Sequence, residues 1–432
     1  MEAGQRCVHQ TGDWKVDSQS EENKLAEIKS FRALRPTAEK AATISSVPYD
    51  VIYESEVREI ISTTPESFLS VTRPDGLFPE GAKPSDEEMQ AAARMNLASL
   101  RDSGNLVQDS EDSIYVYRLS VGGHSQTGFV ACCAVDDYEN DVIKRHEKTR
   151  PDKVKDRTDH MIDLGAQTGL VFLAFKGTPE TSSIISETVA CEPIYDFTAS
   201  DGVRHTIWQV LDSAATVNAF EDIPAVYIAD GHHRVESARV ARQRLRELNP
   251  NHTGDEDYNC FIAGIFPSED LKILPYNRAV KDLNGLSESE FLEKIKGDFT
   301  VEETMEKTPS APGKISMYLG GRWYTITSKI PNLRELGPIE RLDVSVLQDR
   351  LLSPTLGIDD PRTNQRITFI GGARGTGTLE KLVDSGDAAV AFSMFATTMD
   401  DLFAVSDIGE IMPPKSTWFE PKLRDGLLIH LI

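Results

Sequence analysis

The sequence predicts a mixed α/β protein, and two observations carry that prediction. Short apolar runs of strand length, such as AVYIA at residues 225–229, recur along the chain. Between them lie segments with the apolar spacing of helices, and the one at residues 84–104 opens with a capping box of Ser85 and Glu88 and stops at Gly104. The 432 residues suffice for two or three domains with sizeable cores.

The first half of the chain alternates between strand and helix signals. Residues 1–22 are polar and aperiodic, which predicts a disordered tail. The runs SIYVYRL and TGFVACCAV flank the turn SVGGHSQ and predict a hairpin. From Val235 apolar residues recur at helical spacing, and Asn249-Pro250 ends that helix. Further strands are expected at residues 169–175, 203–211, 225–229 and 260–266.

The second half gives the same mixture of elements. The expected order is a capped helix from residue 286, a hairpin at 314–327, a helix at 341–352, a strand at 366–370, a helix at 377–386 and a strand at 388–396. We therefore expect four parts: the tail at 1–22, an N-terminal α/β segment at 23–135, a core at 136–285, and a C-terminal α/β segment at 286–432 that packs back on the core.

Composition narrows the class of protein. The 46 basic and 69 acidic residues give a formal charge of −23, which disfavours a dedicated nucleic-acid binder. No secretory signal and no run of 18 apolar residues is present, so we expect a cytoplasmic protein without a membrane span. The cysteine count is odd and no CxxC pair exists, which argues against a disulfide framework or a zinc knuckle. The cysteines are Cys7, Cys132, Cys133, Cys191 and Cys260.

The first polar motif is Asp230-Gly-His-His-Arg234, placed between the strand run and the helix that follows. Gly231 permits a close backbone approach, and the first amides of a helix are unpaired donors that favour an anion. Arg234 adds a planar fork suited to phosphate. The alternative is a loop whose histidines only cap the helix or contact solvent. A zinc site at His232 and His233 is disfavoured, because adjacent histidines rarely share one metal.

A second polar motif runs from Lys144 to Met161 and carries an acid, Glu147, among cations. A carboxylate in such a field stays ionised and can orient or deprotonate a hydroxyl. The alternative is a solvated charged helix or loop. The members of this motif that we single out are His146, Glu147, Lys148, Thr149, Arg150, Lys153, Arg157, Asp159 and His160.

The third motif, IMPPKSTWFEPKLRDGLL, lies near the C-terminus and places Lys415, Lys422 and Arg424 around Trp418. It either contributes to a site or acts as a structural clasp. Two weaker signals are VPYDVI at residues 47–52, a turn before a helix or a pocket edge, and GGARGTG at residues 371–377. The latter lacks the Lys-Ser/Thr of a phosphate-binding P-loop.

These motifs resemble known families. AVYIADGHHRVESA is similar to the strand, loop and helix of the ParB/sulfiredoxin-like fold, and Asp-Gly-His-His-Arg is the form found in the free-serine kinases. Those kinases carry an upstream His-Glu with a catalytic glutamate, which corresponds here to His146-Glu147. From about Ser30 onward the chain resembles the DUF1015 proteins. The matching stretches are VPYDVI, DDYENDVIKRHEKTRPDKVKDRTDH, QTGLVF, YIADGHHR, YNRAVKDLNG and MPPKSTWFEPKLRDGL.

The resemblance implies a ParB/sulfiredoxin-like catalytic core at 136–285 and transfer of a phosphoryl group from ATP or ADP to the hydroxyl of free L-serine. Phosphoryl transfer needs positioning and charge neutralisation. The residues expected to be catalytic are Glu147, His146, Asp230, His232 and His233, with Asp230 also holding Mg²⁺. Gly231, His232, His233 and Arg234 would bind phosphate. The substrate would contact Lys148, Thr149, Arg150, Lys415, Trp418 and Lys422.

Other classes remain open at this point. The same loop would serve a nucleotide-binding regulatory protein without turnover. A nuclease of the ParB type is disfavoured by the acidic composition, by a different loop and by the lack of a clear helix-turn-helix. Sulfiredoxin-like thiol chemistry is disfavoured because His232 stands where those enzymes have a cysteine. The choice between ATP and ADP, and the oligomeric state, stay undecided.

Overall fold

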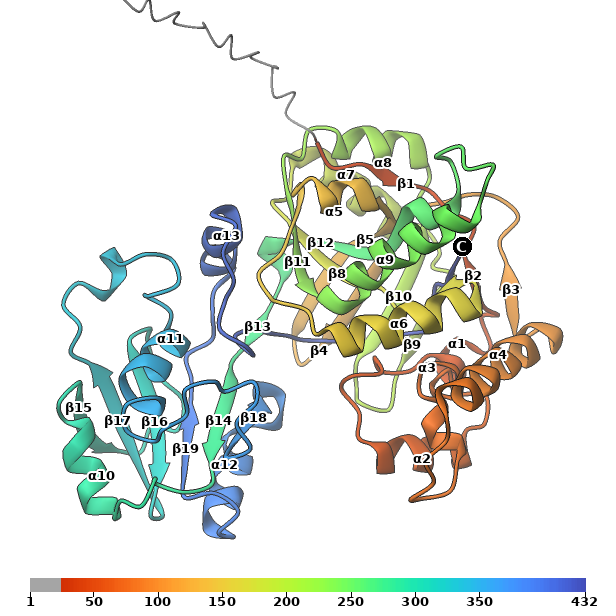
Figure 1. Ribbon diagram of the computed structural model, residues 1–432. Helices are drawn as coiled ribbons and strands as arrows, with labels where there is room; N and C mark the ends of the chain where they lie inside the picture. The colour runs from red at the N-terminus through yellow and green to blue at the C-terminus, as the bar shows by residue number, and fades with distance from the viewer. Residues whose placement is uncertain (1–24) are drawn as a thin grey trace, which may run out of the picture.

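The computed structural model describes residues 25–432, and it forms two units joined side by side (Figure 1). The tail expected at residues 1–22 lies outside the described residues. Strands and helices alternate throughout, so the predicted mixed α/β class is confirmed. Within residues 25–432, none of the helices is long and apolar enough to cross a membrane.

The first unit is built on a large mixed sheet. Its central strands are buried on both faces, since all five residues of β8 and all eight of β12 are buried, which is why they read as continuous apolar runs. The order across the sheet is β6 (Ile143–Lys144), β11 (Val226–Asp230), β8 (Val171–Phe175), β12 (Cys260–Pro267), β5 (His124–Ala134), β4 (Tyr115–Val121), β10 (Arg204–Gln209) and β9 (Tyr195–Thr198), with β1 (Ile28–Lys29) paired to β5.

Helices cover this sheet and extend the unit. The predicted capping box is present, because Ser85 accepts a hydrogen bond from the Glu88 amide at the start of α4. The helices of the first unit are α1 (Ala41–Ile44), α2 (Glu54–Thr63), α3 (Leu69–Thr72), α4 (Asp86–Asp102), α5 (Val135–Glu139), α6 (Pro151–Leu164), α7 (Pro179–Val189), α8 (Ser213–Phe220) and α9 (His232–Leu248).

The second unit contains a separate antiparallel sheet in the order β15 (Phe299–Thr304), β17 (Arg322–Ser328), β16 (Lys314–Leu319), β19 (Val390–Ser393), β14 (Tyr276–Val280) and β18 (Ile367–Gly371). Its helices are α10 (Glu288–Ile295), α11 (Asp343–Leu347) and α12 (Thr376–Asp384). The helix α13 (Met399–Asp407) reaches back to the first unit, where the Phe403 ring lies 4.1 Å from the ring of Tyr227.

The sheets divide the chain differently from the expected limits at 135 and 285. β5 precedes residue 135, yet it pairs with β12 in the middle of the main sheet, and β14 precedes residue 285, yet it belongs to the second sheet. The physical reason is nonlocal strand pairing, which local sequence patterns do not encode.

The C-terminal stretch returns to the first unit. The Met412 amide donates to the carbonyl of His146 at 2.9 Å. Short strands continue this return: β20 (Trp418–Phe419) pairs with β13 (Ile273–Leu274), and β21 (His430–Leu431) pairs with β7 (Ala166–Gln167). A further pair, β2 (Leu34–Pro36) with β3 (Leu106–Gln108), lies beside α4 (Figure 1).

Candidate active site

The loop of the first motif joins β11 to α9, as the strand, loop and helix pattern predicts. Gly231 has φ = +98° and ψ = 27°, a left-handed conformation that side chains disfavour. A Cβ atom at this position would lie 3.3 Å from Nε of Arg234. The chain can therefore turn directly into α9, where the amides of His232 and His233 come before the first hydrogen bond of the helix, which the Arg234 amide donates to the Gly231 carbonyl at 2.9 Å.

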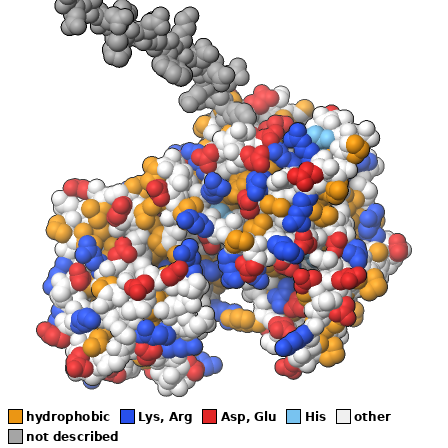
Figure 2. All heavy atoms as spheres, in the orientation of Figure 1, with side chains coloured by type: hydrophobic (Ala, Val, Ile, Leu, Met, Phe, Trp, Pro, Cys, Tyr) orange, Lys and Arg blue, Asp and Glu red, His pale blue; other side chains and the backbone are white. Residues whose placement is uncertain are grey.

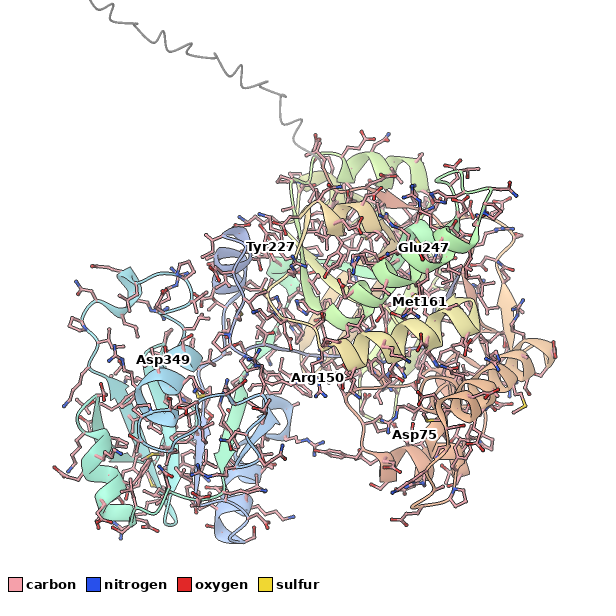
Figure 3. All side chains as sticks on the ribbon, in the orientation of Figure 1. Asp75, Arg150, Met161, Tyr227, Glu247 and Asp349 are labelled. Atoms are coloured by element: carbon pink, nitrogen blue, oxygen red, sulfur yellow. The ribbon has the colours of Figure 1, made fainter. Side chains whose placement is uncertain are left out.

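A cavity of about 790 Å³ opens at this loop. Its lining comes from the first unit, from the linker at residues 411–415, and from Arg362 and Phe369 of the second unit. Figure 2 shows Lys and Arg side chains gathered where the two units meet, and Arg150, labelled in Figure 3, lies at the start of α6 on the side facing the second unit. The basic lining residues are Arg73, Lys148, Arg150, Lys153, Arg157, Arg234, Arg362 and Lys415.

Strand register brings the first two motifs together. β6 and β11 run parallel, with Ile143 opposite Val226. Glu147 follows Ile143 by four residues, and Asp230 follows Val226 by four residues, so both acids leave the sheet at the same edge. Both line the cavity. Residues far apart in sequence therefore share one site.

The acids of this site differ in their surroundings. Asp230 accepts from the Gly231 amide at 2.9 Å and from Lys422 Nζ at 2.8 Å. Burial opposes its ionisation, but the charges of Lys422 and Arg234 prevail and lower its pKa. Glu147 has no hydrogen-bond or ion-pair partner among residues 25–432. Its pKa is raised by burial, with Asp230 and Asp50 adding to the shift and Lys415 opposing it.

Arg234 is held by protein groups on several sides. One terminal nitrogen of its guanidinium donates to the carbonyl of Leu170. Burial works against its charge, yet the carboxylates of Asp50, Asp230 and Asp425 raise its pKa above the usual range. Arg234 lines the cavity, so its remaining N–H groups can reach an anion there.

The two histidines of the loop are neutral acceptors. His232 Nε2 accepts from the His146 amide at 3.3 Å, and His233 Nε2 accepts from the Arg150 amide at 3.0 Å. Burial lowers the pKa of both imidazoles. Each ring thus carries its proton on Nδ1 and can donate a hydrogen bond, but it adds no positive charge at neutral pH.

The structure brings most of the predicted site residues together. Those that line the cavity are Glu147, Lys148, Arg150, Asp230, Gly231, His232, His233, Arg234 and Lys415. Lys422 lies behind Asp230 as its ion-pair partner, and the ring of His146 lies 4.5 Å from that of His232. Burial lowers the pKa of His146 to about 4.

Other predicted residues lie elsewhere. Thr149 does not line the cavity. Trp418 packs against Gly371 and the ring of Tyr276, and its indole donates to Glu420 at 2.7 Å. The glycine-rich stretch 371–377 does not contribute to the lining either.

Residues of the stretch VPYDVI and further members of the second motif also line the cavity. Tyr49 and Asp50 of VPYDVI line the cavity, so this turn forms a pocket edge. Arg157 lies over the Tyr49 ring at 4.5 Å. His160 also lines the cavity, and its buried Nε2 has no partner within the described chain. Arg362 and Phe369 carried no signal, because their role depends on how the two units meet.

Several solved structures are similar to this chain. A mutant free serine kinase in complex with AMP has 16% identity and a TM-score of 0.35, covering 67% of this chain and 86% of the other. A conserved hypothetical protein from Pyrococcus furiosus has 16% identity and a TM-score of 0.34, covering 70% and 95%. SbnI from Staphylococcus aureus, with a C-terminal truncation, has 12% identity and a TM-score of 0.37, covering 70% and 87%. These TM-scores are too low to bear on function.

No curated protein matches this sequence significantly. The family model described as "Protein of unknown function (DUF1015)" matches residues 28–345. That match spans most of the described chain, including the loop at Asp230–Arg234 and the segment around Glu147. The chain therefore belongs to the DUF1015 family.

Proposed function

We propose that this protein is a small-molecule kinase that transfers a phosphoryl group from ATP or ADP to the hydroxyl of free L-serine, giving O-phosphoserine. The observation that carries the proposal is the partner-free carboxylate of Glu147 in the same cavity as the Asp230–Arg234 loop. A phosphate cradle and a free acid across one cavity are the parts that phosphoryl transfer needs.

In this proposal the loop holds the transferred phosphates. The amides of His232 and His233 at the start of α9 would donate to phosphate oxygens, and the absence of a side chain at Gly231 keeps the approach open. Arg234 supplies the planar charged fork, while His232 and His233 donate from Nδ1 as neutral groups. Lys415 adds a second positive charge from the linker.

Glu147 is proposed to hold the acceptor hydroxyl and take its proton. A carboxylate with a raised pKa is a stronger base than an ordinary one, provided it is ionised at the working pH. Without a protein partner, both of its oxygens are available to the substrate. His146 positions this segment, because its amide is bonded to His232.

Mg²⁺ is proposed to accompany the nucleotide, where it would neutralise phosphate charge. Within the described chain, the acids of the cavity do not gather into a ready-made cation cage. This fits an ion held mainly by phosphates and water with one or two carboxylates. Asp230 would contact such an ion through water, because Lys422 and the Gly231 amide already occupy its oxygens.

The proposal that the acceptor is an amino acid rests on the family resemblance. Lys148, Arg150 and Lys415 line the cavity and would bind its carboxylate. Thr149, Trp418 and Lys422 do not line it, so contacts from them would require movement of the segments that carry them.

The testing experiment is a screen of nucleotides against free amino acids and small alcohols, with product masses as the readout. The proposal predicts O-phosphoserine from serine with ATP or ADP. Tight nucleotide binding without any phosphorylated product would instead identify a nucleotide-binding regulatory protein. If no nucleotide binds at all, both functions are excluded.

A further inference from the structure

Three metal-ligand side chains meet inside the first unit, away from the active-site cavity. The sulfurs of Cys132 and Cys260 and a ring nitrogen of His430 all lie within 4.8 Å of one another. The three residues are 1%, 7% and 3% exposed, so this is a buried cluster and not a surface coincidence. Borderline and soft metal ions prefer such a combination of two thiols and an imidazole.

Strand pairing explains why the two cysteines meet. In the β5–β12 ladder Cys132 is opposite Ile262, and Cys260 is opposite Ala134. Since Cys260 and Ile262 are two residues apart, the side chains of Cys132 and Cys260 point to the same face as diagonal neighbours. Cys133 points to the other face and packs in a different part of the core.

His430 reaches the cluster from the C-terminal strand, and its surroundings leave one nitrogen free for a metal. Nε2 lies 3.1 Å from the carbonyl oxygen of Asp257, which can only accept, so Nε2 carries the proton. Nδ1 then keeps its lone pair. A backbone carbonyl that fixes the tautomer in this way is a common outer partner of metal-binding histidines. The Phe31 ring packs edge-on against the imidazole at 5.7 Å.

The backbone of Cys260 is fixed as well. The Gln167 side chain donates to the carbonyl of Cys260 at 2.8 Å and accepts from the amide of Ile262 at 2.7 Å. Gln167 lies on β7, the strand that pairs with β21 and so with His430 itself. One residue thus ties the strand of a thiol to the strand of the imidazole.

We propose that Cys132, Cys260 and His430 form a binding site for a single Zn²⁺ ion, with water or a rearranged protein oxygen in the fourth position. Two sulfurs each roughly 2.3 Å from one ion would lie about 3.8 Å apart, so closure from the present spacing needs only small side-chain shifts. On binding, the thiols lose their protons to solvent and become thiolates.

An ion bound here would tie β21 to the main sheet. Since the returning stretch also carries Lys422, the partner of Asp230, the site would stabilise the placement of that stretch.

The experiment uses the full chain, stripped with a chelator in a phosphine reductant and reloaded with Zn²⁺. Elemental analysis after gel filtration should find about one zinc per chain, with a Kd below about 1 μM in competition with a chromophoric chelator. Each of Cys132→Ala, Cys260→Ala and His430→Gln should weaken binding by roughly 100-fold or more. Cys133→Ala, buried on the opposite face, and Cys191→Ala, exposed, should bind like the parent.

A second readout needs no substitution and so does not depend on variants that fold. Co²⁺ bound to the unaltered chain should give a sulfur-to-cobalt charge-transfer band, which Zn²⁺ abolishes. Absence of both zinc and this band overturns the proposal. So does zinc that survives all three ligand substitutions, or a Cys132–Cys260 disulfide in protein prepared with reductant.

Discussion

Replacing Arg234 by lysine separates the shape of the cation from its charge. Arg234 donates to the buried carbonyl of Leu170 while it lines the cavity, with the carboxylates of Asp50, Asp230 and Asp425 around it. A lysine ammonium keeps the charge balance of these acids. It cannot, however, present a planar fork to the carbonyl and to a phosphate at once.

The expected changes in nucleotide affinity and in folding free energy follow from the hydrogen bonds that Arg234 makes. Loss of one charge-assisted hydrogen bond to phosphate costs about 1.5–3 kcal/mol. That corresponds to a nucleotide Kd weakened about 10- to 150-fold. If the ammonium turns to the phosphate, the Leu170 carbonyl is left unsatisfied, which costs about 1–3 kcal/mol of folding free energy. Because Arg234 lies in the first turn of α9, between the buried residues His232 and Val235, the variant is expected to melt at a lower temperature than the parent.

Calorimetry with ATP and with ADP measures the first effect, and a thermal melt measures the second. The matched control is Arg242→Lys on the same helix, where the arginine pairs with Asp136 and Glu139 at 2.7 and 2.6 Å, outside the cavity. This control should bind nucleotide like the parent. If Arg234→Lys also binds like the parent, Arg234 does not contact phosphate and the loop is not the cradle.

Three further perturbations test separate parts of the site. Gly231→Val forces a β-branched residue into φ = +98°. Calorimetry should show a nucleotide affinity reduced at least about tenfold, and a thermal melt should show a loss of roughly 1–3 kcal/mol of folding free energy. Parent-like behaviour in both measurements would contradict the cradle geometry. Lys422→Met removes the ammonium of a side chain that is 13% exposed and leaves Asp230 with only the Gly231 amide as a donor, which should cost about 1–3 kcal/mol in denaturant unfolding. Lys307→Met removes the ammonium of a side chain that is 47% exposed, and its partner Glu380 keeps the hydrogen bond from the Trp323 indole, so the cost should be under about 1 kcal/mol. Equal costs would show that the burial of the ammonium is not decisive. Burial raises the pKa of Asp425 to about 7, so the folded state binds a proton that the unfolded state releases at a lower pH. The stabilisation from this proton is complete below about pH 4 and is lost as the pH rises through 7, so the free energy of unfolding of Asp425→Asn should rise relative to that of the parent by on the order of 2 kcal/mol between pH 5 and 8. A difference between the two proteins that stays constant across these pH values would refute the shift.

Local patterns in the sequence were sufficient to predict many elements. The capping box at Ser85, the hairpin of β4 and β5, and the passage from β11 through Gly231 into α9 all depend on neighbouring residues. Capping, alternation and glycine conformations act over a few residues, so a single sequence reveals them.

The meeting of the motifs depends on contacts between distant residues. Glu147 reaches the loop only through the parallel pairing of β6 with β11, and Lys422 reaches Asp230 only after the chain returns from the second unit. The dependence on distant contacts also explains why the prediction for Trp418 as a substrate contact was not met. Its motif is rich in cations, but the indole packs against Gly371 and does not line the cavity. Which surfaces cover one another follows from the whole fold and not from a local period.

The most direct test of the proposed function compares the parent with Glu147→Gln, measuring phosphoserine formation and nucleotide affinity on the same preparations. The substitution keeps the size of the side chain and removes the base. We predict O-phosphoserine from the parent, a rate lower by about a hundredfold or more in the variant, and nucleotide affinity within about twofold of the parent. Equal rates of phosphoserine formation in parent and variant would contradict the assignment of Glu147, and absence of phosphoserine from the parent with both ATP and ADP would contradict the kinase itself.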